Sequence, residues 1–149
     1  MSDNLRDATV GSRDDIELRV GARPEHLPLV RAVATNIAMR VDFDLDAISD
    51  LEMALDEACA TLTDRATPGA ELVCRFAVGA DEIAVAVTVP TADPAPPEAS
   101  SVGWRVLNTL ADSVTTVVEP GDRHTADATG VSEHLMRIQL SKRRSLTMG

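Results

Sequence analysis

Residues 48–62 read ISDLEMALDEACATL, and this stretch decides the fold. Its apolar side chains recur at steps of three and four residues: Ile48, Leu51, Leu55, Ala58 and Leu62. That spacing predicts an amphipathic α-helix with one buried face. A carboxylate pair, Asp56 and Glu57, stands too far from either end to cap the helix, and Glu57 should emerge at the edge of the apolar stripe. A core helix with a solvated outer face satisfies the same pattern, so the rest of the chain must decide between that and a functional helix.

The length and composition of the chain are those of one soluble domain. The chain has 149 residues, of which 44% are apolar and 26% charged, enough to bury its own core. Its apolar runs fall short of the ~20 residues of a membrane span, and its polar N-terminus lacks the apolar region of a signal peptide. We therefore expect a cytoplasmic protein without membrane contact. Cys59 and Cys74 fall in apolar periodic segments, which predicts buried free thiols.

The charge is strongly negative and unevenly spread. A formal charge of −10 argues against nucleic acid as a direct partner, because neutralising phosphates needs a basic surface. Residues 41–64 hold eight acids and no Lys or Arg: Asp42, Asp44, Asp46, Asp50, Glu52, Asp56, Glu57 and Asp64. After Glu133 the charged residues are all basic: Arg137, Lys142, Arg143 and Arg144. The acidic run is either a solvated face or a docking surface for a basic protein.

Around the central helix the pattern predicts the order β-α-α-β-β-α-β-β. Period-two strands are expected at 16–20, 72–77, 83–89, 114–118 and 131–140, and helices at 27–41, 44–64 and 102–111. Asp44 and Asp46 are candidate caps of the second helix. This order favours an α+β fold in two layers, with three helices on one mixed, mostly antiparallel sheet.

The same sequence patterns divide the chain into three segments. Residues 1–13 are polar and aperiodic, which predicts a disordered tail. Residues 14–140 form the folded domain, and residues 141–149 a basic C-terminal tail. Within the domain, residues 90–101 carry four prolines and no period, as is typical of a functional or mobile loop.

The element order, with a glutamate in the second helix and a glycine opening the third, resembles the GHKL (HATPase_c, Bergerat-type) ATP-binding fold over about residues 14–140. Within it, the likeness is to small bacterial anti-sigma factors that are also serine kinases of the general-stress and sporulation type. That family carries E-A-x-x-N in the second helix, where Glu positions the reaction and Asn holds Mg²⁺. Here the stretch reads Glu57-Ala58-Cys59-Ala60-Thr61. The Thr61 hydroxyl can still ligate magnesium, but it is shorter than asparagine and lacks the amide carbonyl.

The family's other two boxes are also altered. Its D-x-G-x-G box, whose Asp reads the adenine amino group, is replaced by PTADPAP at 90–96, where Asp93 is out of register and no glycine follows. Proline removes N–H donors, the opposite of what a phosphate-binding loop needs. The G-x-G that opens the last helix appears as Ser101-Val102-Gly103, with Asp112 in its family place. A helix N-terminus can hold an anion unaided, so weak phosphate affinity stays open.

The resemblance implies an anti-sigma factor that sequesters an alternative, stress-type sigma factor and is released by an anti-anti-sigma protein of the STAS type. Its implied partner-binding residues are Arg31, Asp50 and Asp56, although Arg31 also reads as an ordinary exposed arginine. The family commonly pairs, which implies a homodimer.

Two alternatives stay open. The first is a serine kinase that phosphorylates the antagonist. Glu57 would be its catalytic residue, Thr61 a weak Mg²⁺ ligand, and Mg-ATP would lie against Glu57, Thr61, Asp93, Ser101 and Gly103. The altered boxes weigh against efficient catalysis. The second is an unrelated α/β domain with neither partner nor nucleotide, to which the scattered histidines (His26, His124 and His134) contribute no metal spacing.

Overall fold

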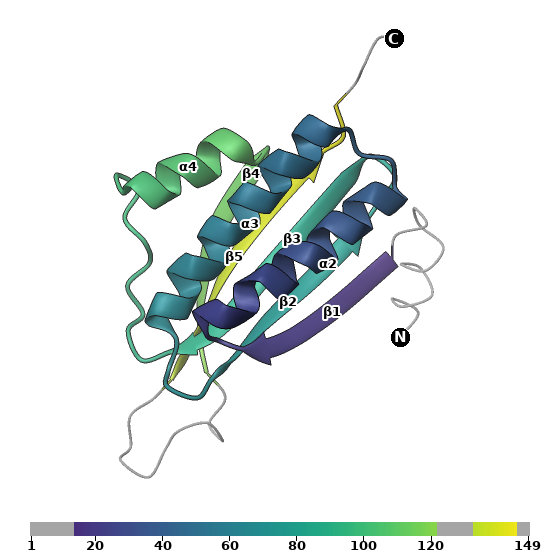
Figure 1. Cartoon of the computed structure of the whole chain (residues 1–149). Coiled ribbons are helices and arrows are strands. Elements are labelled where there is room, and N and C mark those ends of the chain that lie inside the picture. Colours follow the sequence, from purple (N-terminus) through teal and green to yellow (C-terminus); the bar gives the residue numbers. More distant parts are fainter. Residues whose placement is uncertain (1–13, 122–132, 146–149) are drawn as a thin grey trace, which may run out of the picture.

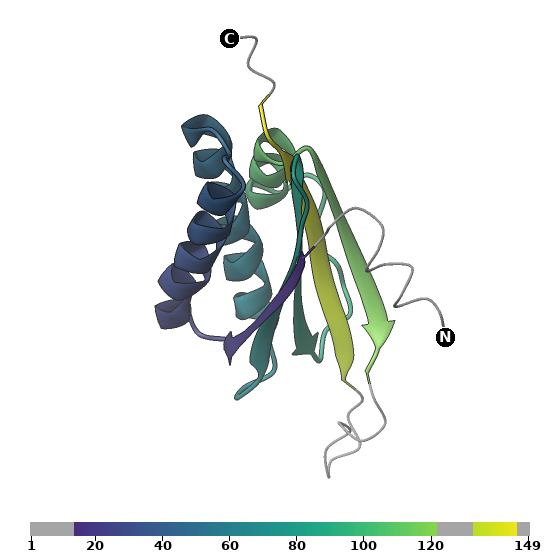
Figure 2. The ribbon, with the colours of Figure 1, turned by 90° about the vertical axis from the view of Figure 1, so that its right-hand side faces the viewer.

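A computed structural model describes residues 14–121 and 133–145 (Figure 1). The tail predicted at 1–13, the strand start predicted at Val131, and His124 lie outside these residues. The elements are β1 (Asp14–Gly21), the 3₁₀ turn η1 (Pro24–His26), α2 (Leu27–Arg40), α3 (Leu45–Arg65), β2 (Glu71–Val78), β3 (Glu82–Thr91), α4 (Val102–Leu110), β4 (Ser113–Pro120) and β5 (His134–Arg143). Helices α2 and α3 cover one face of the sheet (Figure 2), and α4 packs beside α3. None of the described helices has the length and hydropathy of a membrane span.

The sheet has the strand order β1-β2-β3-β5-β4. The predicted two-layer α+β fold is confirmed, and the sheet is antiparallel at every described pairing rather than mixed. The strands β2 and β3 are antiparallel because they form a hairpin. The edge strand β1 runs opposite to β2, and β5 runs opposite to both of its neighbours, β3 and β4.

The strand β5 also corrects a predicted boundary. The basic tail was expected to begin at residue 141, but the strand continues to Arg143. Backbone pairing explains the extension, since Ser141 lies opposite Ser113 of β4 and Arg143 opposite Glu82 of β3. Backbone hydrogen bonds can extend a strand without any apolar side-chain pattern.

The core lies between the helices and the sheet. Alternate side chains of β2 and β3 are buried against α3, as period-two strands require. The buried stripe of α3 contains all five residues predicted for it, Ile48, Leu51, Leu55, Ala58 and Leu62. Ala47, Ala54 and Cys59 are buried with them. Asp44 is the N-cap of α3, as predicted, and its side chain accepts a hydrogen bond from the Ala47 amide at 3.1 Å.

The two cysteines are free and buried in this core, as expected. Cys59 comes from α3 and Cys74 from β2. A hydrogen bond to Cys74, together with burial, raises the pKa of the Cys59 thiol well above its ordinary value. Both thiols therefore act as small apolar side chains of the core.

Candidate nucleotide hollow and partner surface

A hollow of about 570 Å³ lies between α3, the loop after β3 and the N-terminus of α4. Its lining includes all five residues predicted to contact a nucleotide: Glu57, Thr61, Asp93, Ser101 and Gly103. Residues more than 30 positions apart in the sequence thus meet at one place, as the resemblance implied.

Among the other lining residues, four with polar or aromatic side chains were not predicted for this site: Asp64, Arg65, Glu98 and Trp104. The first two follow Glu57 by seven and eight positions, so helical spacing alone could have indicated them. Trp104 is adjacent to Gly103 and could have been included with the glycine box. The sequence around Glu98 carries no comparable signal, because its loop has no period.

The Glu57 carboxylate lies against the first turn of α4. A Cβ atom placed on Gly103 would overlap Glu57 Oε2, so a larger residue here would force the end of the Glu57 side chain to move. From the other side, Thr61 Oγ1 donates a hydrogen bond to the same oxygen over 3.4 Å. The place of the family's asparagine is therefore taken by a hydroxyl that contacts Glu57.

Ser101 is the N-cap of α4. Its hydroxyl accepts a hydrogen bond from the Trp104 amide at 3.2 Å, and its backbone carbonyl accepts one from Arg105 at 3.1 Å. The serine that replaces the family's first glycine thus satisfies a helix N–H that an anion could otherwise bind.

Asp93 is occupied within its own loop. Its Oδ1 accepts a hydrogen bond from the Ala95 amide at 2.9 Å, and its backbone N–H donates to Thr91 Oγ1 at 3.2 Å. Arg65 reaches from α3 and donates to the Ala95 carbonyl at 2.9 Å. The loop is therefore held to α3 by a turn built around Asp93.

The charges around the hollow do not suit Mg-ATP. Four carboxylates line it, those of Glu57, Asp64, Asp93 and Glu98. The one cation among its described lining residues, Arg65, already donates a hydrogen bond to a loop carbonyl. Among the described residues, no three His, Cys, Asp or Glu side chains are grouped as a metal site. Asp93 is bonded within its own loop, the Ser101 hydroxyl takes up a helix amide, and Arg65 already has a partner, so the residues present do not fit the nucleotide that the fold implies.

The predicted partner residues divide between two places. Arg31 of α2 and Asp56 of α3 form an ion pair at 3.1 Å, and both side chains are partly exposed. About one helical turn away, Thr35 donates a hydrogen bond to Glu52 across the same two helices. We call this exposed line of contacts between α2 and α3 the helix seam.

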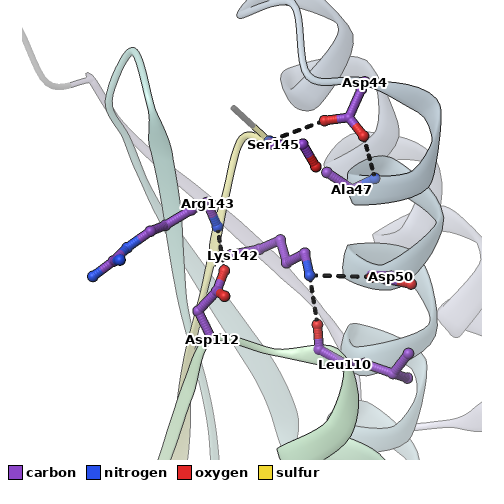
Figure 3. Close-up of polar contacts among 8 residues, drawn as sticks. All are labelled: Asp44, Ala47, Asp50, Leu110, Asp112, Lys142, Arg143 and Ser145. Carbon is purple, nitrogen blue, oxygen red and sulfur yellow. Dashed lines mark hydrogen bonds and ion pairs between the residues drawn. The ribbon is translucent and has the colours of Figure 1, made fainter. Parts of the chain in front are cut away.

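Asp50 lies away from the helix seam. It stands six residues before Asp56, which places the two side chains about 120° apart around α3. Its Oδ2 accepts a hydrogen bond from Lys142 Nζ at 3.1 Å, and the same ammonium donates to the Leu110 carbonyl at 3.0 Å (Figure 3). Asp50 therefore connects α3 to β5 and to the end of α4, and the predicted trio does not form one surface.

Lys142 belongs to a short segment, residues 142–145, that we call the C-terminal clamp (Figure 3). The Arg143 amide donates to Asp112 Oδ2 at 2.6 Å, and the Ser145 amide donates to Asp44 Oδ1 at 3.0 Å. Arg144 pairs with Asp81 at 2.9 Å. Two acids of the predicted docking run, at positions 44 and 50, are thus engaged by the chain's own basic segment.

Comparison with known proteins gives one family and several relatives. Residues 20–126 match the family described as histidine kinase-like ATPase domain. The anti-sigma-F factor RsbW of Mycobacterium tuberculosis (strain ATCC 25618 / H37Rv) is 35% identical over 132 residues, which cover 87% of this chain and 74% of that protein. The serine-protein kinase RsbW of Bacillus subtilis (strain 168) is 34% identical over 77 residues, 50% of this chain and 48% of that protein. The same-named kinase of Bacillus velezensis is 34% identical over 79 residues, 51% of this chain and 49% of that protein.

Proposed function

Because this chain belongs to the histidine kinase-like ATPase domain family, we propose that it is an anti-sigma factor of the RsbW type. It binds an alternative, stress-type sigma factor, keeps it from RNA polymerase, and releases it when an anti-anti-sigma protein of the STAS type takes its place. The relative that supports this role most directly is named an anti-sigma-F factor and aligns with 87% of this chain.

The helix seam is the observation that carries the proposal. The Arg31–Asp56 pair is 45% and 37% exposed, so either side chain can exchange its internal partner for one on a docked protein. The same two helices carry exposed large apolar side chains: Leu29, Met39, Leu45 and Met53. Apolar groups beside charged ones are what a protein interface uses, whereas a merely solvated face needs no exposed methionines.

Charge reversal at the seam tests this role. The sigma factor is first captured from host lysate on the tagged chain, identified by mass spectrometry and purified. Arg31→Glu should then abolish its binding without unfolding the chain, because the side chain is partly exposed. Arg105→Glu makes the same charge change on the exposed side of α4 and should bind normally. Unchanged binding by Arg31→Glu would remove the seam from the interface.

A kinase activity on the STAS-type antagonist is the second candidate. It is favoured by relatives named serine-protein kinases, among them that of Bacillus subtilis (strain 168). Thr61→Asn restores the family's Mg²⁺ ligand but leaves Asp93 bonded within its loop. We therefore expect no phosphate transfer from labelled ATP to the antagonist by this variant, and appreciable transfer would show that the loop still admits adenine.

We also propose that two copies of the chain pair through the outer face of the sheet, which no described helix covers (Figure 2). That face has a shallow hollow of about 430 Å³ at small side chains such as Ala77, Ala84 and Ala86. Ala84→Arg should convert a dimer into a monomer in sedimentation velocity, and a monomeric wild-type chain would contradict the pairing.

A further inference from the structure

We propose that the side of β4 facing away from β5, which we call the β4 edge, is a docking site for an extended segment of another protein. The segment adds to the sheet as a further antiparallel strand. It has uncharged, β-branched residues at its centre and basic residues at its ends. The inference goes beyond the proposed binding of a sigma factor and does not depend on it, because the β4 edge and the helix seam share no residue.

The β4 edge carries backbone groups that the described part of the chain leaves without partners. In the strand order β1-β2-β3-β5-β4, only β5 is a described neighbour of β4 (Figure 1). The Gly121 amide donates to the Glu133 carbonyl at 2.8 Å, so these two residues form a hydrogen-bonded pair. Bonded pairs alternate along an antiparallel ladder, which turns the N–H and C=O groups of Val114, Thr116 and Val118 away from β5. An added strand binds through such a row of donors and acceptors.

The side chains of β4 leave this row open to pairing. Residues 113–118 read SVTTVV, an uncharged run rich in β-branched residues, and no residue of β4 is buried. The strand at the opposite edge, β1, carries four charged residues: Asp14, Asp15, Glu17 and Arg19. Charged side chains protect edge strands from pairing with other chains. The β4 edge lacks that protection over residues 113–118.

Acidic residues at the two ends of β4 select the occupant. Asp112 precedes the strand and is exposed, and Glu119 near its end is 48% exposed. A second copy of β4 in antiparallel pairing would bring Glu119 of one chain beside Asp112 of the other, and these like charges repel. A segment with Lys or Arg at its ends places opposite charges there instead. The occupant is therefore a different protein with basic residues on both sides of the added strand.

A synthetic heptapeptide, KVTVTVK, with blocked ends and a fluorescent label, is the probe. Its three valines take the places opposite Val114, Thr116 and Val118, on the helix-facing side of the sheet. Antiparallel pairing in this register sets the first lysine opposite Glu119 and the last lysine beside Asp112. We expect saturable binding to the wild-type chain in fluorescence anisotropy, and the absence of binding would overturn the proposal.

Two methylated peptides test whether the peptide backbone makes the contact. An N-methyl group on the central valine removes an N–H that points at Thr116, whereas one on the next threonine removes an N–H that points at solvent. The first change should weaken binding about tenfold or more, because a hydrogen bond is lost and the methyl group holds the strands apart. The second should change the affinity by less than about twofold. Equal affinities of the two methylated peptides would contradict strand addition.

Thr116→Pro makes the same test on the protein. It removes an amide hydrogen that β5 does not use, and proline is tolerated on an edge strand where its nitrogen faces solvent. We expect a loss of peptide affinity of about tenfold or more, with cooperative urea unfolding retained. If this variant does not fold, the methylated peptides decide the question with the wild-type chain.

Arg19→Pro is the matched control at the opposite edge of the sheet. The Ala22 amide donates to the Ala70 carbonyl at 2.9 Å, so by the same alternation the Arg19 N–H points away from β2. This variant should bind the peptide within about twofold of the wild type. Equal losses in the two proline variants would mean that the peptide does not bind at β4, which overturns the proposal.

Two further measurements identify the occupant and separate this proposal from the proposed function. A wild-type dimer that Thr116→Pro converts into monomers in sedimentation velocity would place a second copy on the β4 edge and overturn the assignment to another protein. Sigma-factor binding is measured on the wild-type chain. Peptide binding without sigma-factor binding would leave the β4 edge standing and contradict the proposed function, and the reverse pair of results would do the opposite.

Discussion

At the scale of single residues, Asp44 joins the first turn of α3 to the C-terminal clamp. One carboxylate oxygen accepts the Ala47 amide and the other the Ser145 amide. Burial opposes ionisation, but these two amides, together with the Ser145 hydroxyl and the amide of Asp44 itself, more than offset it, so the pKa of Asp44 is lowered from its ordinary 3.8. The folded chain therefore holds this carboxylate ionised more readily than the unfolded chain does.

The lowered pKa sets the direction of a pH effect. A carboxyl whose folded pKa lies below its unfolded pKa stabilises the fold above the unfolded value, and that stabilisation is lost as the pH falls through the folded pKa. The difference in unfolding free energy between the wild type and Asp44→Asn should be constant from about pH 7 to pH 5 and should shrink below about pH 4. Urea unfolding at pH 7, 5 and 3.5 measures it, and a difference that stays constant down to pH 3.5 would contradict the assignment.

The buried thiols give a second prediction at this scale. Contact with Cys74 and burial raise the pKa of Cys59, and both side chains are at most 1% exposed. A thiol-specific reagent such as DTNB at pH 8 should thus modify neither cysteine in the folded chain and both in denaturant. Stoichiometric modification without denaturant would show that the α3–β2 contact opens readily.

The sequence could predict which residues line the candidate site, but not the contacts that they make. Its five residues were identified because a family pattern places them by sequence position, and the structure gathers them in one hollow. The contact of Glu57 with Gly103 and the turn around Asp93 depend on side-chain packing between distant segments, which no local spacing encodes. The contact of Asp50 with Lys142 could not be predicted for the same reason, because the two residues lie 92 positions apart.

At the scale of elements, α3 and the β2–β3 hairpin could be predicted well because each has a strong local period. The apolar stripe of α3 and the alternation in β2 and β3 both reflect burial of one face. The end of β5 could not be predicted, since residues 141–143 join the sheet through backbone pairing while their side chains are polar. A period of apolar residues indicates which face of an element is buried. It cannot indicate how far a strand continues beyond the core.

The C-terminal clamp gives a prediction at this scale. Lys142 is 15% exposed and joins Asp50 of α3 to the last carbonyl of α4. Lys142→Ala leaves both acceptors without their donor and should cost about 1–3 kcal/mol of unfolding free energy. Arg143→Ala, next along the strand, removes a side chain that is 74% exposed and should cost less than about 0.5 kcal/mol. Equal losses in urea unfolding would mean that the ammonium does not hold α4.

At the scale of the whole molecule, the formal charge of −10 acts before any contact forms. A basic partner is attracted over distances of about a Debye length, and salt shortens that length. The association rate with the purified sigma factor should fall about tenfold or more between roughly 50 mM and 500 mM salt, with a smaller change in the dissociation rate. Stopped-flow mixing measures both rates, and a salt-independent association rate would contradict steering by charge.

The strand order has a consequence for the growing polypeptide on the ribosome. Chain synthesis delivers β4 before β5, yet β5 lies between β4 and β3 and is the described neighbour of both. Until residues 134–143 have emerged from the exit tunnel, β4 has no described strand to pair with and the edge of β3 stays open. The helices α2 and α3 are by then long complete, so the nascent chain displays its helix seam on a sheet that is still unfinished. A chain shortened to end at Pro120 should therefore fail to give a cooperative unfolding transition, which circular dichroism would detect.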